Sequence, residues 1–379
     1  MEYWLWLRTI KGLGPVMGQK LLSSFGDPMA IYNACEEELM SVKGIGKSIA
    51  NLILSSRSLA KAYSILSECE KYDIKILTYN DPLYPNIAKG YSDSPALLYY
   101  RGNIKENCEG VAIIGSRRCS SYGKEIAITA AEFLTKNNIT IISGMAKGID
   151  SYAHISCINN GGYTLAFLGC GVDICYPSEH KELMEAIIHN GAVISEYPPA
   201  TKPRREYFPR RNRLISSWSR RVLVVEAAEK SGALITANTA IAQGKDVYAP
   251  PHEINSITGK GSNKLLLKDA KMYLEPSQLL FESYIKKSNK ITSTEDILPK
   301  KCDSIKSPKN DIINLSPIEK KILTSINNVA KSIEVISMET QIDQMELIEY
   351  LFEMELDGKI TALAGGIYRK VPGTNLLTY

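Results

Sequence analysis

The sequence predicts an α/β protein built on a Rossmann-like, doubly wound parallel sheet, with a helical domain before it and a small helix-and-hairpin domain after it. Three observations predict this architecture. Residues 1–65 are helical in pattern and punctuated by glycine, residues 110–275 alternate short apolar segments with helical stretches, and residues 312–372 combine helical periodicity with a strand-like end. Apolar strands that alternate with helices are typical of a parallel sheet covered on both faces, which right-handed crossovers make doubly wound.

The domain boundaries are placed where the composition changes, because 379 residues exceed what one hydrophobic core usually organises. We predict a helical domain over residues 1–70, a sheet domain over 71–285, a linker over 286–311 and a small domain over 312–379. The linker prediction rests on a polar, lysine-rich stretch with two prolines, KKSNKITSTEDILPKKCDSIKSPKND.

The composition excludes several classes of protein. With 44% hydrophobic and 23% charged residues the chain is not mostly disordered, and no apolar run reaches the roughly eighteen residues of a membrane span. The start, Met1-Glu2-Tyr3-Trp4, lacks the features of a signal peptide, so we expect a cytoplasmic protein without membrane contact. Eight scattered cysteines without a CxxC pair predict neither a disulfide framework nor a metal site, and we expect no cofactor.

The first domain carries two similar glycine turns. Ile10-Lys11-Gly12-Leu13-Gly14 and Val42-Lys43-Gly44-Ile45-Gly46 each stand between two helical stretches. Two glycines around one apolar residue allow a tight turn that leaves backbone N–H groups facing outward at the start of a helix. The pattern resembles the helix-hairpin-helix module, which grips nucleic-acid phosphates with those amides, and the second copy is the better match. The alternative is that both turns only pack helices, as in SAM-like bundles.

In the middle domain, small and polar residues follow the predicted strands, which are residues 111–114, 140–142, 163–168, 192–194, 222–225 and 247–249. Ligands of a doubly wound sheet sit at the carboxyl ends of its strands, so these residues are predicted to line the site. Small residues let the backbone approach a phosphate, and Arg117 can make two hydrogen bonds to one. The first loop is not GxGxxG, and GxxxxGK[ST] occurs nowhere, so neither a dinucleotide nor a P-loop nucleotide is the expected ligand. The candidate binding residues of these loops are Gly115, Ser116, Arg117, Arg118, Ser143, Gly144, Lys147, Ser231, Gly232 and Thr236.

The strongest charge feature is a run of seven arginines and one glutamate between Arg204 and Arg221, interleaved with Tyr207, Phe208 and Trp218. The net charge of the chain is only +4, so any nucleic-acid affinity has to come from such local clustering. Arginines neutralise backbone charge, while aromatic faces stack on bases without reading their sequence. The alternative is a solvated arginine face over core aromatics, and for Trp218 we expect the core. The candidate contacts are Arg205, Phe208, Arg210, Arg211, Asn212 and Arg213.

Six motifs stand in the order found in the bacterial DNA-processing protein A family (DprA, also called Smf), and the chain resembles that family closely over about residues 75–280. Six ordered motifs are far more specific than a single glycine-rich loop. They are GSRR at Gly115–Arg118, SGMAKGID at Ser143–Asp150, GCGVDICYP at Gly169–Pro177, FPRRNRLI at Phe208–Ile215, SGALITA at Ser231–Ala237 and GKGSNKLL at Gly259–Leu266.

The resemblance implies a non-enzymatic protein that binds single-stranded DNA, protects incoming strands in natural transformation and loads the RecA recombinase onto them. It also implies a homodimer formed through the Rossmann-like domain, although no motif identifies the interface. By the same resemblance, one strand contact falls on Arg117 and others on the segment Arg205–Asn212, while Ser143, Gly144 and Lys147 continue the groove.

The last domain resembles the winged helix that some members of this family carry. Ser316-Pro317 begins an amphipathic helix, Ile342–Leu356 predicts another helix, and residues 358–369 predict a hairpin. Gln341–Glu355 contains five carboxylates and no lysine or arginine. We therefore expect a protein-contact or regulatory role rather than binding in a DNA major groove.

Two alternatives would make the protein an enzyme. Asp150 and His154 could share a helix face for acid–base chemistry, but a helix cap and a structural histidine are the simpler interpretation. The other alternative is a Rossmann-type phosphoribohydrolase, which releases the base from a nucleoside monophosphate. Such enzymes typically show PGGxGTxxE, whereas no PGG precedes EAAEKSGALIT at Glu226–Thr236, and Ala237 stands where the acid is expected. We expect no catalysis.

Overall fold

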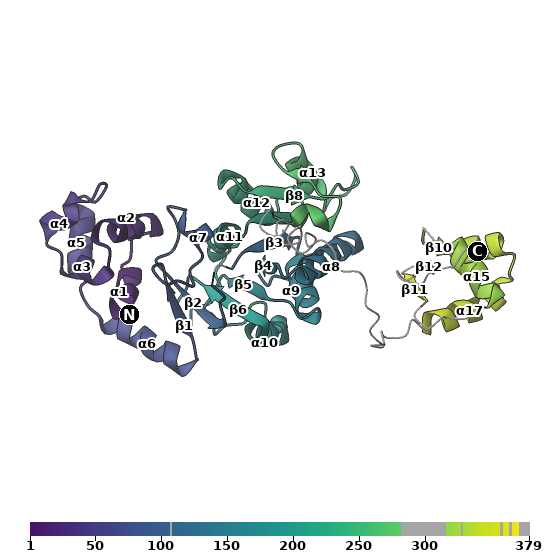
Figure 1. Cartoon of the computed structure of the whole chain (residues 1–379), viewed down its shortest axis with the longest axis horizontal. Coiled ribbons are helices and arrows are strands. Elements are labelled where there is room, and N and C mark those ends of the chain that lie inside the picture. The colour runs from purple at the N-terminus through teal and green to yellow at the C-terminus, as the bar shows by residue number, and fades with distance from the viewer. Residues whose placement is uncertain (107, 282–315, 327–328, 357–358, 364–365, 371–379) are drawn as a thin grey trace, which may run out of the picture. The chain divides into compact units, whose positions relative to one another are not determined.

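Figure 1 shows the computed structural model of the chain, which describes residues 1–106, 108–281, 316–326, 329–356, 359–363 and 366–370. The chain divides into two compact units, Met1–Thr294 and Glu295–Tyr379. The predicted linker, residues 286–311, lies outside the described residues. No helix within the described ranges combines the length and the apolar character that crossing a membrane requires.

The first unit begins with six helices that form the predicted helical domain. They are α1 (Glu2–Thr9), α2 (Pro15–Phe25), α3 (Pro28–Asn33), α4 (Glu36–Ser41), α5 (Lys47–Ser55) and α6 (Ala60–Lys71). The two glycine turns have the same backbone: Gly12 and Gly44 have φ of 92° and 95°, and Gly14 and Gly46 then cap α2 and α5 from an extended conformation. The repeated sequence pattern is therefore a repeated structure, two helical hairpins in tandem.

A nine-stranded sheet follows, in the order β1-β2-β6-β5-β4-β3-β7-β8-β9. Strands β3 to β9 are parallel; the sequence predicted β3 to β8 but not β9. Strand β2 pairs antiparallel with both β1 and β6. The neighbours of β3 are β4 on one side and β7 on the other, so the winding reverses there and leaves a crevice at the carboxyl ends of β3 and β7. The strands are β1 (Lys75–Thr78), β2 (Leu97–Gly102), β3 (Gly110–Gly115), β4 (Thr140–Ser143), β5 (Thr164–Leu168), β6 (Gly191–Ser195), β7 (Arg221–Glu226), β8 (Asp246–Ala249) and β9 (Lys271–Met272).

Helices cover both faces of this sheet, because its central strands are apolar on both sides (Figure 1). In β3, Val111 and Ile113 belong to the core that includes α8 (Ser121–Lys136) and α9 (Ile149–Asn159). Ala112 and Ile114 belong instead to the core that includes α11 (Tyr207–Trp218) and α12 (Ala233–Ala242). Within its described residues this unit also contains α7 (Asn86–Lys89), α10 (Lys181–Asn190), α13 (Lys260–Leu266) and the 3-10 turns Ser178–His180 and Pro276–Leu279.

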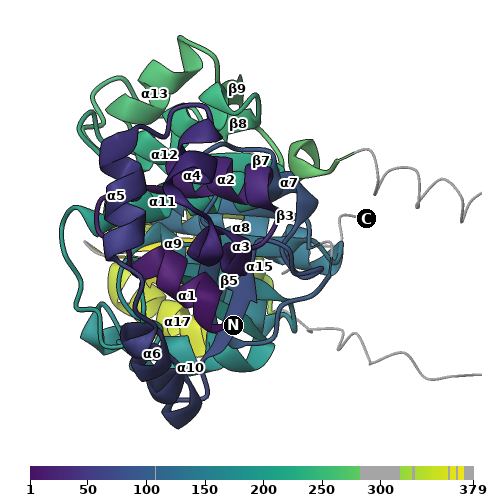
Figure 2. The same cartoon turned by 90° about the vertical axis from the view of Figure 1, so that its left-hand side faces the viewer.

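The helical domain packs against the sheet through a shared apolar core. Leu5 and Trp6 of α1 belong to the same buried cluster as Leu97 of β2 and Val193 of β6. In Figure 2, which is turned by 90°, helices α1 to α6 face the viewer with the sheet behind them. This docking brings the first glycine turn close to the strand ends of the sheet domain.

The described part of the second unit contains three helices and a three-stranded antiparallel sheet of order β10-β12-β11. Its elements are α15 (Pro317–Ser325), β10 (Lys331–Ser332), α16 (Ile333–Thr340), α17 (Gln344–Leu356), β11 (Ile360–Leu363) and β12 (Ile367–Lys370). Ser316 and Glu319 form a capping box at the start of α15, and Lys359 pairs with Glu319 at 2.6 Å. The predicted helices and hairpin are present, and the winged-helix identity of this unit stays a prediction.

Candidate nucleic-acid interface

A cavity of about 790 Å3 occupies the crevice at the carboxyl ends of β3 and β7. Three segments line most of it: Ile114–Arg117 after β3, Ala228–Thr236 after β7, and Pro203–Ile215, which includes the first turns of α11. The loop after β4 adds Ala146, the first turn of α9 adds Asp150, and the loop after β5 adds Tyr176. We call this cavity the groove.

The first loop of the groove is held in a tight turn by its own backbone. The Ser116 amide donates to the Glu226 carbonyl at 2.7 Å, and the Ser116 hydroxyl accepts from the amide of Arg118 at 3.1 Å. A side chain at Gly115 would meet Ile149 at 2.6 Å, so glycine is needed for the loop to lie against α9. The exposed side chain of Arg117 extends from this fixed turn toward Phe208.

Phe208 forms an aromatic edge of the groove together with Tyr176. Its half-buried ring lies 5.6 Å from the Arg117 guanidinium and 5.8 Å from the Arg211 guanidinium. The Tyr176 ring lies 5.4 Å away, tilted by 43°. On its other side the Phe208 ring packs on Gly169, where a Cβ atom would come within 3.1 Å. Guanidinium groups beside aromatic rings are attracted to the ring faces, which favours this orientation of Phe208.

Arg211 lies beneath this edge and holds the floor of the groove. It is 5% exposed and donates to the carbonyls of Gly144, at 2.5 Å, and of Phe167. Ser143 is fully buried and donates to the Ile113 carbonyl at 2.6 Å. The side chains of Arg211 and Ser143 therefore bind the protein's own backbone, and Gly144 is held between the Arg211 and Asp150 side chains, so these residues set the shape of the floor.

Asp150 and His154 are both occupied within the protein. The Asp150 carboxylate accepts from the amides of Gly144 and Ala146 at 3.2 and 3.4 Å, so it fastens the loop before α9 instead of occupying the helix cap, which is Gly148. Burial raises the pKa of Asp150, although the Arg211 guanidinium acts in the opposite direction. His154 is fully buried, bonds Thr164 at 2.7 Å, and has its pKa lowered by burial to about 3, so it is neutral.

The third loop of the groove is joined to α11 by Asn212. Its side-chain amide donates to the Gly232 carbonyl at 3.2 Å, and its oxygen accepts from Arg211. In the structure this amide is therefore bonded to the loop after β7. Ser231 and Gly232 open α12 at the groove wall, whereas Thr236 is only 1% exposed.

The groove brings together ten of the sixteen predicted site residues: Gly115, Ser116, Arg117, Arg205, Phe208, Arg211, Asn212, Ser231, Gly232 and Thr236. Arg118, Ser143, Gly144, Lys147, Arg210 and Arg213 do not line it. Lys147 pairs with Glu179, and Arg213 pairs with Glu196 at 2.6 Å. The run from Arg204 to Arg221 is thus divided between the groove, the core and a second surface, and Trp218 is fully buried, as expected.

The sequence analysis missed three side chains that line the groove, Tyr176, Arg204 and Lys230. Tyr176 is 40% exposed, and the signal for it was an aromatic residue just before Pro177 in a loop that follows a predicted strand. Four cationic side chains on the groove wall therefore face one carboxylate, that of Asp150. The four are Arg117, Arg204, Arg205 and Lys230. No group of three or more metal-ligating side chains occurs among the residues that the structure describes.

These features define a class: a doubly wound α/β protein that presents glycine-rich anion loops, guanidinium groups and aromatic rings at its topological switch point, the arrangement of a nucleotide or polynucleotide binder. The model of the family described as DNA recombination-mediator protein A matches residues 75–283, and that of the SAM-like helix-hairpin-helix tandem matches residues 7–57. The chain therefore belongs to the DNA recombination-mediator protein A family and has a role in DNA processing.

Individual relatives support the same assignment. Protein Smf of Synechocystis sp. is 31% identical, and the alignment covers 97% of this chain and 98% of that protein. The structure of DNA processing protein A (DprA) from Streptococcus pneumoniae is 29% identical with a TM-score of 0.65, over 74% of this chain and 99% of that one. The structure of the Helicobacter pylori protein, which addresses its single-stranded DNA binding mode, is 30% identical with a TM-score of 0.50, over 58% of this chain and 97% of that one.

Proposed function

We propose that the groove binds single-stranded DNA without chemical change, that the protein protects the bound strand, and that it loads the RecA recombinase onto it. The observation that carries this proposal is the aromatic edge, where Phe208 and Tyr176 lie 5.4 Å apart beside the Arg117 guanidinium. Aromatic rings stack on unpaired bases, and guanidinium groups bind the phosphates between them.

The arrangement favours an unpaired strand over a duplex. Stacking on Phe208 or Tyr176 requires the open face of a base, which a duplex keeps covered by its neighbouring base pairs. Arg117, Arg204, Arg205 and Lys230 supply charge for the backbone but no set of base-reading groups, because Asn212 is engaged by Gly232. Binding is therefore expected to depend strongly on salt and only weakly on sequence.

A salt titration tests the proposal. If about four phosphates are neutralised, the logarithm of the association constant for a single strand should fall against log salt with a slope near −3, from roughly 0.7 per phosphate. The matched duplex should bind more weakly at every salt concentration. A flat salt response, or equal affinity for both forms, would contradict the groove as a single-strand site.

The enzymatic alternative lacks an available acid in the groove. Glu226 is fully buried and accepts from the amide and hydroxyl of Ser120 at 2.9 and 2.8 Å, and Glu229 pairs with Lys264. Neither glutamate lines the groove, and the carboxylate that does, Asp150, is held by two amides. Incubation with nucleoside monophosphates should release no free base, and detection of free base would favour the phosphoribohydrolase.

We propose that the homodimer forms at the β9 edge of the sheet. Exposed apolar side chains occur on β9 and in the chain segments just before and after it, namely Ile254 at 93%, Ile257 at 82%, Leu267 at 85%, Met272 at 50% and Leu274 at 70%. A group of exposed apolar side chains of this kind is typical of a protein interface. Leu267→Arg should convert a dimer to a monomer in analytical ultracentrifugation, whereas Met29→Arg on α3 should not. A wild-type monomer at micromolar concentration would contradict the dimer.

RecA loading and strand protection have their own tests, and we propose that both take place in the cytoplasm. The protein should slow exonuclease digestion of a single strand. It should also speed the assembly of RecA filaments on a strand that is covered by a single-strand-binding protein. Arg117→Ala should weaken both effects because it weakens the grip on the strand. Protection without faster RecA assembly would leave binding in place and refute the loading step.

A further inference from the structure

A second cavity, of about 540 Å3, lies between the helical domain and the sheet domain. The first glycine turn lines one side of it, from Gly12 to Pro15. The other side is lined by Tyr197 after β6 and by Arg210 and Arg213 of α11. We call this space the junction cavity; the second glycine turn, at Gly44 and Gly46, does not line it.

Helix α11 separates the junction cavity from the groove. Phe208 and Asn212 line the groove, whereas Arg210 and Arg213 line the junction cavity. Residues two apart on a helix point about 200° away from each other, so Phe208 and Arg210 necessarily project to different sides of α11. Helix α11 therefore presents one side to the groove and another side to the junction cavity.

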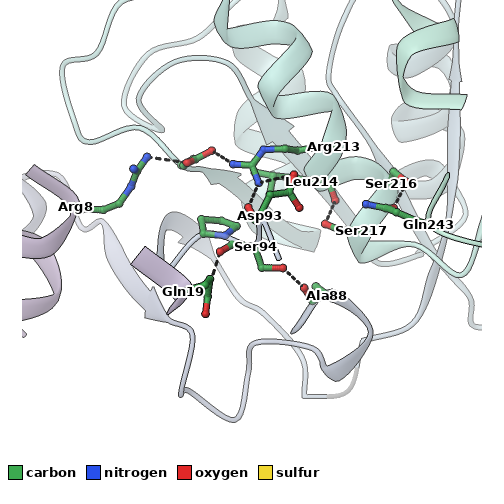
Figure 3. Close-up of polar contacts among 12 residues, drawn as sticks. Arg8, Gln19, Ala88, Asp93, Ser94, Arg213, Leu214, Ser216, Ser217 and Gln243 are labelled. Carbon is green, nitrogen blue, oxygen red and sulfur yellow. Dashed lines mark hydrogen bonds and ion pairs between the residues drawn. The ribbon is translucent and has the colours of Figure 1, made fainter. Parts of the chain in front are cut away.

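The two carboxylates in the junction cavity are already paired. Glu196 is 5% exposed, and its two oxygens accept from Arg8 at 2.8 Å and from Arg213 at 2.6 Å. Arg213 also donates to the Asp93 carbonyl and lies 3.6 Å from the Asp93 carboxylate. Figure 3 shows this bridge from Arg8 through a carboxylate to Arg213 and Asp93. The bridge fixes the helical domain against α11. It engages two of the three arginines that line the junction cavity, Arg8 and Arg213, and does not involve the third, Arg210.

The other hydrogen-bond donors that line the junction cavity are of the kinds that bind an anion. Arg210 is exposed and has no hydrogen bond or ion pair among the residues that the structure describes. Gly14 caps the eleven-residue helix α2, whose first amides have no partner within the helix and carry its positive dipole end. Tyr197 is 8% exposed, and its hydroxyl is buried without a hydrogen-bond partner. A helix start, a free guanidinium and an unsatisfied hydroxyl are together the donor set of a phosphate site.

We propose that the junction cavity binds a backbone phosphate of the same DNA strand that occupies the groove, so that the helical domain and α11 grip the strand beyond its stacked bases. This inference rests on the proposed function of the groove. It predicts that strands too short to leave the groove do not sense the junction cavity, whereas longer strands do.

The glycine caps offer a matched pair of variants. Gly14 and Gly46 both have extended backbones with φ of −74° and −92°, and a Cβ atom at either would meet nothing within 4 Å. Aspartate is at least as good a helix cap as glycine, so Gly14→Asp and Gly46→Asp should both fold with unchanged or higher thermal stability. Both add one negative charge, but only Gly14→Asp adds it to the junction cavity.

The experiment measures binding of oligothymidylates of about 6 and about 20 nucleotides, which bracket the roughly 4–16 nucleotides of common single-strand sites. With the longer strand, Gly14→Asp and Arg210→Gln should each bind on the order of tenfold more weakly, as expected for a lost charge-assisted hydrogen bond, and the salt slope should become shallower by about 0.7. With the shorter strand both should match wild type, and with the longer strand Gly46→Asp should bind more tightly than Gly14→Asp.

Two results would overturn the inference: equal effects of Gly14→Asp and Gly46→Asp on the longer strand, or equal weakening of both strands by Gly14→Asp. Arg117→Ala separates failure of the groove from failure of the junction cavity, because it should weaken binding of both the shorter and the longer strand. If Arg117→Ala changes neither, the proposed function fails; if it weakens both while Gly14→Asp and Arg210→Gln change neither, only the junction cavity fails.

Discussion

Replacing Phe208 by leucine tests whether this ring stacks on DNA or only fills space. Leucine keeps an apolar side chain against Gly169 but removes the flat face and its contacts to the Arg117 and Arg211 guanidinium groups, at 5.6 and 5.8 Å. Stacking is worth about 1–3 kcal/mol per base, so the affinity for a single strand should fall about 5- to 150-fold. Fluorescence anisotropy with a labelled oligothymidylate at fixed salt measures this change.

The cost to stability should be small enough for the variant to fold. The substitution removes two cation–π contacts, each worth about 0.5–1 kcal/mol near a surface, and one aromatic pair worth about 0.5–1.5 kcal/mol. The leucine side chain recovers part of this packing, and a domain of this kind has about 5–15 kcal/mol of stability. Thermal unfolding should therefore show a cooperative transition at a slightly lower temperature.

Two controls make the Phe208 result specific. Phe208→Tyr keeps the ring and should keep most of the affinity. Tyr63→Leu removes an aromatic side chain that is 55% exposed on α6, outside the groove, and should leave affinity unchanged. If Phe208→Leu bound the strand as tightly as wild type at the same folded fraction, stacking by Phe208 would be refuted and the ring would be part of the core only.

Three further predictions concern the groove and the buried groups beneath it. Arg117→Ala should weaken single-strand binding strongly and leave the unfolding temperature nearly unchanged, because its exposed side chain has no ion pair in the described part of the chain; a gel shift with unchanged binding would contradict this. Arg211→Met should instead lower both stability and binding, by about 2 kcal/mol or more of unfolding free energy, because two buried carbonyls lose their donor; denaturant unfolding measures this, and an unchanged midpoint would contradict it. His154 has a pKa of about 3 in the folded protein against about 6.5 when unfolded, so its contribution is fully present above pH 6.5 and is lost as the pH falls. Between pH 7.5 and 5 the free energy of unfolding of wild type should fall by about 2 kcal/mol more than that of His154→Asn. Parallel pH profiles of the two proteins would refute this contribution of His154 to stability.

Local sequence was sufficient for the elements that local chemistry dictates. The alternation of apolar segments and helical stretches predicted the parallel strands β3 to β8, because a strand buried on both faces must be apolar throughout. The spacing of glycines predicted both helical hairpins, because only glycine adopts the positive φ of Gly12 and Gly44 without strain. The sequence analysis missed β1, β2 and β9. Strands β1 and β9 are short edge strands, and β2 lies between β1 and β6 and pairs with β6, which comes much later in the chain. Local sequence does not specify pairings of this kind.

The residues of the groove also divide into those that local sequence predicts and those that only the tertiary structure places. Gly115, Ser116 and Arg117 were predictable because the loop after a parallel strand must lie at the carboxyl edge of the sheet. The arginines near Phe208 were not separable by composition: Arg211 is buried beneath the ring, Arg213 is paired with Glu196, and Arg210 faces the helical domain.

The sequence by itself determined that a sheet edge with glycine-rich loops and a cation-rich aromatic segment belong to one domain. Only the tertiary structure decided which side chains of that segment reach the groove. The physical reason is that each residue of a helix points about 100° away from the one before it, so neighbouring arginines of α11 enter different environments. Those environments are supplied by β5, by the loop after β7 and by the helical domain. None of these elements adjoins α11 in the chain, so the local sequence of α11 does not specify them.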